Sequence, residues 1–262
     1  MDTFSDEVLS QEEISILKNQ EIRLVSKFKA EQLERDSKKF WDLFYKRNED
    51  RFFKDRHWTT REFKELINYS HEKKVLLEVG CGAGNFIYPL LLEDPYSYFI
   101  YACDFSPRAI QLVQSHKLYD QKYIKAFVTD ITKSNALNEI RKNSIDIVTL
   151  IFMLSSIHPQ HYDKILHNLH RVLKSGAIIL FRDYGLYDMT QLRFKPGHKI
   201  FDNFYMRQDG TRTYFFSLEF LKNLFLKNGF REIETIYVNK RIINKKENID
   251  VPRRFVQARY IK

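Results

Sequence analysis

The sequence predicts an α/β fold: a parallel sheet with helices between its strands, an antiparallel strand pair at the C-terminal end and a helical appendage at the N-terminal end. The main observation is a regular alternation of strand-like and helix-like segments, which is typical of parallel sheets. The expected strands are 73–79, 98–104, 123–130, 144–154 and 177–183, with a helix after each of the first four. Two extended segments, 232–243 and 252–261, flank the polar stretch 244–250 and predict the antiparallel pair.

The N-terminal appendage is expected to be helical from residue 11 to residue 47. This stretch has no glycine or proline, and Phe40, Leu43 and Phe44 stand at helical spacing. An aromatic and basic connector, 51–63, follows it. Thr59 and Glu62 in the connector fit a capping box that would start a helix near Arg61. We therefore divide the chain into an N-terminal helical region, 1–70, and an α/β domain, 71–262.

Two helix starts within the α/β domain are marked by their capping residues. Ser106 precedes Pro107 just after the second strand, an arrangement that favours an N-cap followed by proline in the first turn. Ser217 is the expected N-cap of the last helix, and Gly229 its end.

Charge is concentrated near the C-terminus. The net charge is +9, and residues 193–262 hold 16 Lys and Arg against 7 Asp and Glu, so their difference of 16 − 7 equals the whole excess. Such a region suits a polyanion, either nucleic acid or acidic lipid, although charge alone fits a solvated surface equally well. No apolar run is long enough to span a membrane, and nothing at Met1 resembles a secretion signal. Cys81 and Cys103 are expected to be buried, reduced residues rather than a disulfide.

A glycine-rich turn directly follows the first strand. Glu78 is the next-to-last residue of that strand, and Gly80, Gly82 and Gly84 then alternate with other residues. Alternating glycines allow a tight turn and a close approach of a nucleotide-type cofactor to the backbone. The spacing G-x-G-x-G differs from the G-x-G-x-x-G of dinucleotide binders, which argues against NAD and an oxidoreductase.

Acidic residues end the next two strands. Asp104 can accept hydrogen bonds from ribose hydroxyls, and Asp130, followed by Ile131, can accept one from an adenine amino group. The ordered set from Glu78 to Asp130 resembles the Rossmann-like class I S-adenosylmethionine-dependent methyltransferases over residues 73–183. The resemblance implies S-adenosylmethionine as cofactor and S-adenosylhomocysteine as product.

The fifth strand delivers Arg182, Asp183 and Tyr184 at its end. Because this end borders the cofactor crevice in such sheets, the three side chains are candidate catalytic residues that hold the hydrogen-bonding edge of a base. The alternative is an Arg182–Asp183 ion pair with a packed tyrosine, and composition alone slightly favours it.

Several longer motifs resemble the eukaryotic tRNA 3-methylcytidine methyltransferases, and the similarity spans nearly the whole chain. They are WDLFYKRN (41–48), FFKDRHWTTREF (52–63), ACDFSPRAI (102–110), FRDYGLYD (181–188) and FYMRQDGTRTYFF (204–216). The compact N-terminus is most similar to the branch that modifies cytidine 32 in the anticodon loop of serine tRNAs. That branch implies tRNA and seryl-tRNA synthetase as partners, no membrane, and a cytoplasmic location that extends to the nucleus. The alternatives are threonine or arginine tRNAs, a small-molecule methyltransferase and a non-catalytic RNA-binding scaffold.

The resemblance also assigns roles to individual residues. It implies that Trp41, Tyr45 and His57 close the cofactor site over Glu78, Gly80, Gly82, Asp104, Asp130 and Ile131. Core packing is the alternative for these aromatic residues, and the favoured one for Trp58. Ile151 and Phe152 are expected to line the pocket or the core. Asp183 would accept from the exocyclic amine and stabilise the methylated ring, while Arg182 addresses O2. No Cys/His spacing resembles a metal site.

The resemblance implies that the N-terminal helical region, 1–70, contributes to the RNA surface. Further RNA contacts are expected from a basic and aromatic insertion at about 190–215 and from the terminal strand pair. Arginine and lysine bind phosphates, and neighbouring aromatic rings stack on bases. The candidate residues are Arg193, Lys195, Lys199, Arg207, Arg212, Lys245, Lys246, Arg253 and Arg254.

Overall fold

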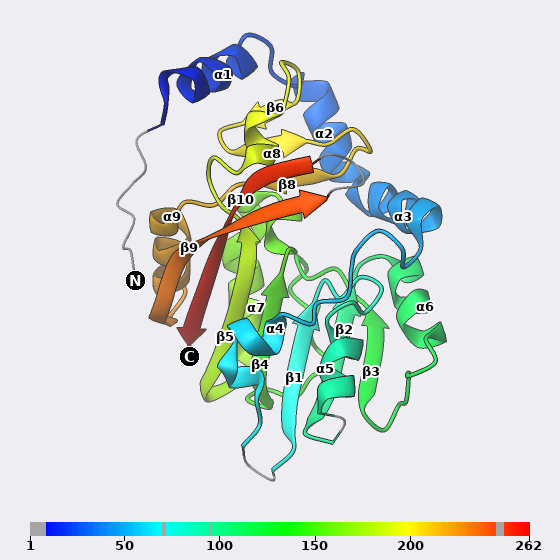
Figure 1. Cartoon of the computed structure of the whole chain (residues 1–262). Helices are drawn as coiled ribbons and strands as arrows, with labels where there is room; N and C mark the ends of the chain where they lie inside the picture. The colour runs from blue at the N-terminus through cyan, green and yellow to red at the C-terminus, as the bar shows by residue number, and fades with distance from the viewer. Residues whose placement is uncertain (1–8, 70–71, 95, 245–248) are drawn as a thin grey trace.

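The computed structural model describes residues 9–69, 72–94, 96–244 and 249–262, and these form an α/β molecule around one large sheet (Figure 1). The sheet has seven strands in the order β3-β2-β1-β4-β5-β10-β9, in which β1 to β5 are parallel and β10 runs antiparallel to both neighbours. The strands are β1 (Lys74–Val79), β2 (Tyr98–Asp104), β3 (Ile124–Val128), β4 (Ile145–Ile151), β5 (Leu173–Tyr184), β9 (Arg231–Asn244) and β10 (Ile249–Ile261). The predicted parallel sheet and terminal antiparallel pair are confirmed.

Helices cover both faces of the sheet. The helices of the α/β part are α5 (Ile87–Glu93), α6 (Pro107–Ser115), η2 (Leu154–Ser156), η3 (Pro159–His161), α7 (Tyr162–Val172), α8 (Met189–Leu192) and α9 (Leu218–Lys227). One core packs α7 and α9 against β4, β5 and β10, and the other packs α5 and the end of the connector against β1 and β2. In the described part of the chain, no helix is both long and apolar enough to cross a membrane.

The N-terminal region forms separate helices where the sequence predicts a continuous one. They are α1 (Gln11–Glu21), α2 (Lys27–Arg35) and α3 (Ser37–Asn48), followed in the connector by α4 (Thr59–Glu62) and η1 (Lys64–Leu66). The prediction of one helix over 11–47 is wrong because Val25 donates its backbone N–H to Lys199 O at 2.8 Å. Ser26 is extended and caps α2, its hydroxyl accepting from Lys29 N. A tertiary backbone hydrogen bond thus replaces a helical one.

The insertion predicted at 190–215 is a small antiparallel sheet of β6 (Lys199–Phe201), β7 (Phe204–Met206) and β8 (Arg212–Tyr214). The N-terminal helices pack against it, as Figure 1 shows. Buried Gln20 donates from Nε2 to Gln191 O at 2.9 Å and to Phe194 O at 3.0 Å. The N-terminal helical region and the insertion are therefore one structural unit.

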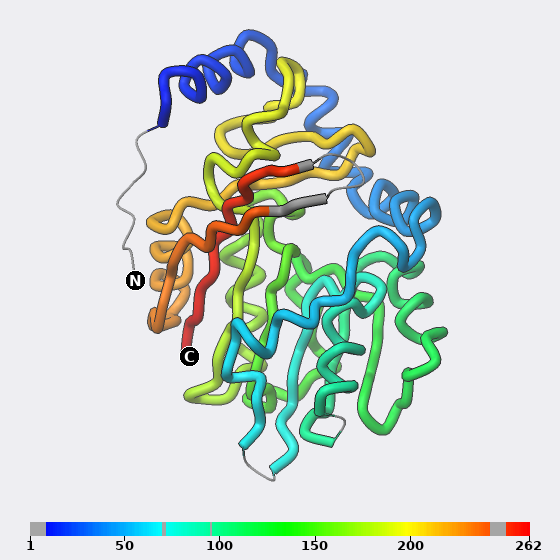
Figure 2. The backbone as a smooth tube through the Cα atoms, viewed as in Figure 1, coloured from blue at the N-terminus to red at the C-terminus, as the bar shows by residue number. Residues whose placement is uncertain are grey.

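The connector between α3 and β1 crosses the front of the sheet (Figure 2). The capping box predicted there is wrong: α4 starts after Trp58 without a side-chain cap, and the Thr59 hydroxyl donates to Arg56 O. Glu62 pairs with Arg182 of β5 and Lys240 of β9. The Glu62 carboxylate therefore forms long-range ion pairs instead of the hydrogen bond that a capping box requires.

Some of the remaining local predictions are confirmed and others are wrong. Ser106 and Ser217 cap α6 and α9 as expected, and Gly229 follows α9 with φ +84°. Cys81 and Cys103 are buried and free. The helix predicted between the third and fourth strands is wrong, because residues 129–144 form turns, and both strands are shorter than expected.

A buried carboxylate joins the end of β5 to β10. Asp188 is fully buried and accepts from Arg253 Nε at 2.9 Å, Arg254 N at 2.7 Å and Thr190 N at 2.9 Å. Asp188→Ala should therefore lower the free energy of unfolding by about 3–5 kcal/mol, measured by urea denaturation, because it leaves the half-buried Arg253 guanidinium and the Arg254 N–H without their acceptor. Asp250→Ala, which removes an exposed partner of Arg241, is the control and should leave the midpoint unchanged. Equal effects of the two substitutions would contradict this account.

Candidate cofactor and acceptor site

The glycine loop after β1 is closely packed on two sides. Gly80, Gly82 and Gly84 have φ of +71°, +55° and +89°, values that L side chains rarely adopt. A Cβ on Gly80 would lie 2.2 Å from Met153 Cγ, and one on Gly82 would lie 2.7 Å from the Tyr45 hydroxyl. The loop therefore requires glycine both for its conformation and for the close approach of its neighbours.

Glu78 presents a buried carboxyl group beneath this loop. The residue is 1% exposed, its Oε1 lies 3.9 Å from Arg56 Nη1, and its Oε2 has no hydrogen-bond partner. Burial raises the pKa of Glu78 to about 8; the nearby Arg56 lowers it and Asp104 raises it further. An unpartnered buried carboxylate oxygen fits a ligand that brings a cationic hydrogen-bond donor.

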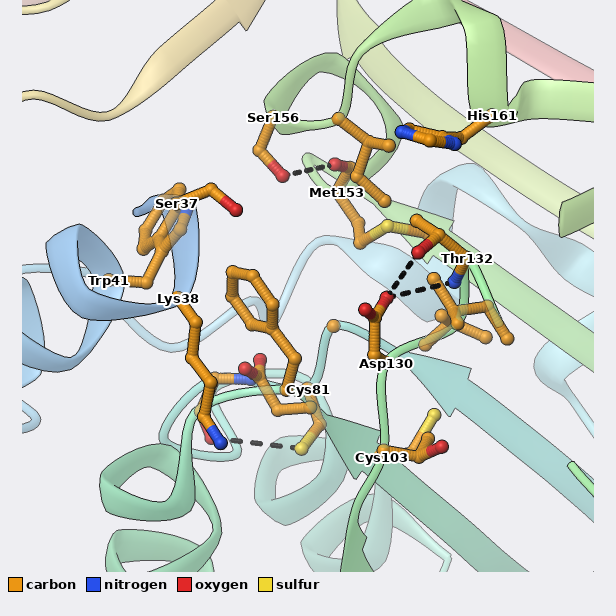
Figure 3. A pocket seen from close by; sticks show the side chains of 18 of the residues that line it. Ser37, Lys38, Trp41, Cys81, Cys103, Asp130, Thr132, Met153, Ser156 and His161 are labelled. Atoms are coloured by element: carbon orange, nitrogen blue, oxygen red, sulfur yellow. Dashed lines mark hydrogen bonds between the residues drawn. The ribbon is translucent and has the colours of Figure 1, made fainter. Parts of the chain in front are cut away.

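Two more carboxylates follow β2 and β3. Asp104 accepts from Gly82 N at 3.1 Å and from Ser106 N at 2.9 Å, and burial raises its pKa to about 6. Asp130 Oδ1 accepts from Thr132 N at 3.0 Å and from Thr132 Oγ1 at 2.6 Å. Figure 3 shows Asp130 and Thr132 across the cavity from Ser37, Lys38 and Trp41 of α3.

These groups surround a cavity of about 610 Å³, a size typical of cofactor sites. Its walls are the carboxyl ends of β1 to β4 on one side and α2 and α3 on the other. Of the predicted cofactor residues, Trp41, Tyr45, Gly80, Gly82, Asp104, Asp130 and Ile131 line it. Glu78 lies behind the lining next to Arg56, and Ile151 contributes its carbonyl oxygen to the same arginine at 3.2 Å.

Arg56 lies where the sequence led us to expect His57. His57 is exposed and is not among the lining residues, whereas Arg56 lines the cavity and contacts Glu78, Ile151 O and the Phe152 ring. Arg56 N donates to Asn85 O at 2.8 Å, which attaches the connector to the glycine loop. Arg56 was not predicted because it is a single arginine directly before the histidine, in a segment without regular periodicity.

An aromatic cluster on α3 covers the cavity. Trp41 and Tyr45 are one turn apart, with ring centroids 6.1 Å from each other, and Phe44 meets both rings edge-on. Burial holds the pKa of Tyr45 well above its usual range, so this hydroxyl stays protonated. The structure supports both predictions for this pair, cavity lining and packing, because the same rings do both.

The three candidates at the end of β5 point to different places. Arg182 is buried, donates to Gln257 Oε1 at 3.1 Å and to Glu62 Oε2 at 3.2 Å, and lies 4.8 Å from the Trp58 ring. Asp183 is fully buried and accepts from Ser155 N and its own neighbour Tyr184 N, both at 2.9 Å. The alternative of an Arg182–Asp183 pair is wrong, since Arg182 pairs with Glu62. The direct roles of both residues toward a base stay predictions, and their positions favour support of the site.

Tyr184 is placed differently, beside the cavity. Its ring lies 5.2 Å from that of Phe152, a cavity residue held at φ +55°, and the Arg207 and Arg253 guanidiniums lie 5.4 Å and 5.7 Å from it. Strained backbone of this kind often accompanies functional sites. The structure thus brings together one catalytic candidate and two RNA candidates from three distant segments.

The other RNA candidates differ in exposure. Arg193 and Lys195 are exposed, and the Arg254 guanidinium lies 3.8 Å from the Tyr237 ring. Lys199 and Arg212 are buried: Lys199 pairs with Glu21 and Asp202, and Arg212 pairs with Glu34 at the cavity wall. Lys245 and Lys246 lie outside the described residues. The buried pair is thus engaged within the protein, which favours a structural role for it.

The fold and site together define an S-adenosylmethionine-dependent methyltransferase, because the glycine loop, the acidic strand ends and the unpartnered Glu78 oxygen fit that cofactor. Residues 45–235 match the family model described as a methyltransferase domain. A solved Burkholderia thailandensis 1,6-didemethyltoxoflavin-N1-methyltransferase, with S-adenosylhomocysteine bound, has a TM-score of 0.57 at 14% identity, covering 87% of this chain and 89% of that one. Within the described residues, no group of three His, Cys, Asp or Glu side chains is arranged to hold a metal ion.

Curated relatives identify a more specific family among the methyltransferases. The chain is 50% identical to the human protein named tRNA N(3)-cytidine methyltransferase METTL6, over 97% of this chain and 90% of that protein. It is 42% identical to the Schizosaccharomyces pombe protein named tRNA N(3)-methylcytidine methyltransferase trm140, over 86% of this chain and 74% of that protein. The chain belongs to the tRNA 3-methylcytidine methyltransferase family.

Replacement of Arg56 should weaken cofactor binding. In Arg56→Ala, Glu78 loses its nearest cation and the connector loses its contact with Ile151 O. We expect the Kd for S-adenosylhomocysteine, measured by calorimetry, to rise about tenfold or more, since a buried carboxyl without its cation is costly to ionise. Arg51→Ala, at an exposed pair with Glu49, is the control. Unchanged affinity in Arg56→Ala would refute the assignment.

The pKa of Glu78 predicts how stability depends on pH. Because its pKa in the folded cofactor-free protein is raised, the folded state binds this proton more tightly than the unfolded state. The contribution is fully present below about pH 4.5 and is lost as pH rises through about 8. Glu78→Gln should therefore make the decline of the thermal midpoint over this range shallower. A decline as steep as in the wild type would show that Glu78 does not titrate there.

Proposed function

We propose that this protein methylates N3 of cytidine 32 in the anticodon loop of tRNA, with serine tRNAs as its main substrates. The observation that carries the proposal is the position of Tyr184. Its ring joins the cofactor cavity, through Phe152, to the guanidiniums of Arg207 and Arg253. A base stacked there would lie beside the cofactor while its phosphates meet arginines. The names of the curated relatives supply the nucleoside and the atom.

The chemistry needs alignment more than acid-base catalysis. S-adenosylmethionine supplies a methyl group on a sulfonium, and cytosine N3 attacks it with its lone pair. The N–C bond forms as the S–C bond breaks, and the positive charge passes from sulfur to the base. An unpaired loop nucleotide can expose N3 without the cost of opening a duplex. The protein's task is to hold the ring in line with the methyl group.

Asp183 can supply the negative charge that stabilises the positively charged methylated base. Burial raises the pKa of Asp183 to about 6, although its backbone hydrogen bonds and Arg207 lower it. At neutral pH the residue is then mostly ionised, close to Tyr184 and beneath the Ser155 turn. We retain it as the residue that stabilises positive charge on the ring. Arg182, bound to Glu62 and Gln257, would position this strand end.

Partners and location complete the proposal. We infer that seryl-tRNA synthetase presents the tRNA and that the enzyme works in the cytoplasm and also in the nucleus. The support is the resemblance of the sequence motifs to the serine-tRNA branch of the family. Threonine or arginine tRNAs are the nearest alternative substrates. A small-molecule methyltransferase would leave Arg193, Lys195 and Arg207, which form no ion pair with the described residues, without a partner of suitable charge.

The test is an assay of labelled nucleosides. The purified protein is incubated with methyl-labelled S-adenosylmethionine and total tRNA, with and without seryl-tRNA synthetase, and the tRNA is then digested. We expect label in 3-methylcytidine from serine tRNA, increased by the synthetase. Tyr184→Ala should lower the rate by about tenfold or more, because stacking contributes on the order of 1–3 kcal/mol per base.

Matched variants sharpen this assay. Tyr184→Phe keeps the ring and should retain most of the activity, and Asp183→Asn should lower kcat while cofactor affinity stays unchanged. Label in another nucleoside, or none despite cofactor binding, would overturn the substrate assignment. Normal turnover by Asp183→Asn would remove that residue from the mechanism.

A further inference from the structure

A second cationic surface lies apart from the C-terminal basic residues. It is a groove lined by α2, α3 and α6; α3 contacts both of the others, and the three follow one another from the top down the right-hand side of Figure 1. Its cations are Arg35, Lys38, Lys39, Lys46 and Arg108, all exposed, and we call it the α3–α6 groove. Lys39 and Lys46 stand seven residues apart on α3, so they share one helix face over about 10 Å.

The carboxylates of the α3–α6 groove are already engaged within the protein. Asp36 accepts from Arg35 Nε at 3.2 Å, and Asp42 accepts from the Ser106 hydroxyl. Among the described residues, no carboxylate oxygen lies within 4.0 Å of the charged nitrogens of Lys38, Lys39, Lys46 or Arg108. The groove therefore holds five cations against two carboxylates, and only Arg35 of the five is ion-paired, so its net charge is positive.

The groove is continuous with the cofactor cavity. Arg35 and Lys38 line both, and Figure 3 shows Lys38 near Trp41, across the cavity from Asp130. A polyanion lying in the groove would therefore reach the cavity edge. Only the methyl acceptor has to enter that cavity together with the cofactor, and this favours a nucleic acid over an unrelated anionic partner.

The groove also lies on the opposite side of the cavity from Tyr184. α6 follows β2 and packs against β3, near one end of the strand order, whereas Tyr184 and Arg253 belong to β5 and β10 on the other side of β1 and β4. The glycine loop lies between them. Cations on both sides of the entrance suit a strand that passes across it with one base turned inward.

We propose that the α3–α6 groove binds phosphates of the tRNA strand on one side of the target nucleotide, while Arg207 and Arg253 bind on the other. This inference rests on the proposed function. It deepens the expectation that the N-terminal region 1–70 contributes to the RNA surface, because that expectation named none of these five residues and did not include Arg108 of α6. The groove has no base-reading aromatic residue of its own, so its contribution is to hold the strand in register.

The test combines charge reversal with salt dependence. Lys39→Glu/Lys46→Glu and the milder Lys39→Ala/Lys46→Ala are compared with the wild type in tRNA binding and in KM for tRNA. We expect the reversed variant to raise KM about tenfold or more and the alanine variant to lower the salt slope of binding by about 1.4, since each single-strand phosphate contact contributes about 0.7. The Kd for S-adenosylhomocysteine should stay unchanged, which verifies folding.

Lys122→Glu/Lys142→Glu is the matched control. Both lysines are exposed in loops that precede β3 and β4, at the edge of the sheet away from the cavity. If the groove variants behave like this control while the wild type methylates tRNA, the groove inference is wrong and the proposed function stands. Normal tRNA binding with loss of the stimulation by the synthetase would assign the groove to a protein partner and overturn the RNA assignment. If the wild type itself methylates no tRNA, the proposed function fails first.

Discussion

The buried carboxyl group of Glu78 is the constraint on which the site depends. It sits on a central strand, with one oxygen near Arg56 and the other without a hydrogen-bond partner. Burial raises the pKa of this carboxyl group, which therefore destabilises the cofactor-free fold at neutral pH. A cofactor that carries a cationic amino group can supply both the charge and the donor. Binding and local stabilisation therefore have the same physical origin.

Arg56 connects this requirement to the rest of the molecule. It belongs to the connector, whose backbone binds Asn85 O and whose far end is fixed by the pairing of Glu62 with Arg182 and Lys240. The connector thus links the glycine loop to β9 and to β5, which ends at Tyr184. The N-terminal helices are held in turn by the insertion 190–215: Gln20 donates to Gln191 O and Phe194 O, and Val25 N donates to Lys199 O of β6. The cofactor site, the proposed acceptor site and the insertion proposed to bind RNA are parts of one connected structure.

The sequence was most informative where backbone conformation determines the structure. Alternating glycines and acids at strand ends predicted the cofactor wall, because parallel strands place their carboxyl ends together. The sequence was least informative where tertiary contacts determine the structure. The N-terminal helix breaks before Ser26 because Val25 forms a backbone hydrogen bond to Lys199, and no local sequence pattern predicts this break. The sequence named His57 and missed Arg56, because an irregular connector gives no periodicity from which side-chain direction follows. Alternation along β5 does indicate that Arg182 and Asp183 face opposite sides of the sheet.

The central claim is that the cofactor completes the environment of Glu78, and proton release on binding tests it most directly. Titration of S-adenosylmethionine into the protein at neutral pH, in buffers of different ionisation enthalpy, gives the number of protons released. With a pKa of about 8 before binding, Glu78 should lose its proton as the cofactor binds, and Glu78→Gln should abolish this release. Binding without proton release, or equal release by Glu78→Gln, would contradict the account.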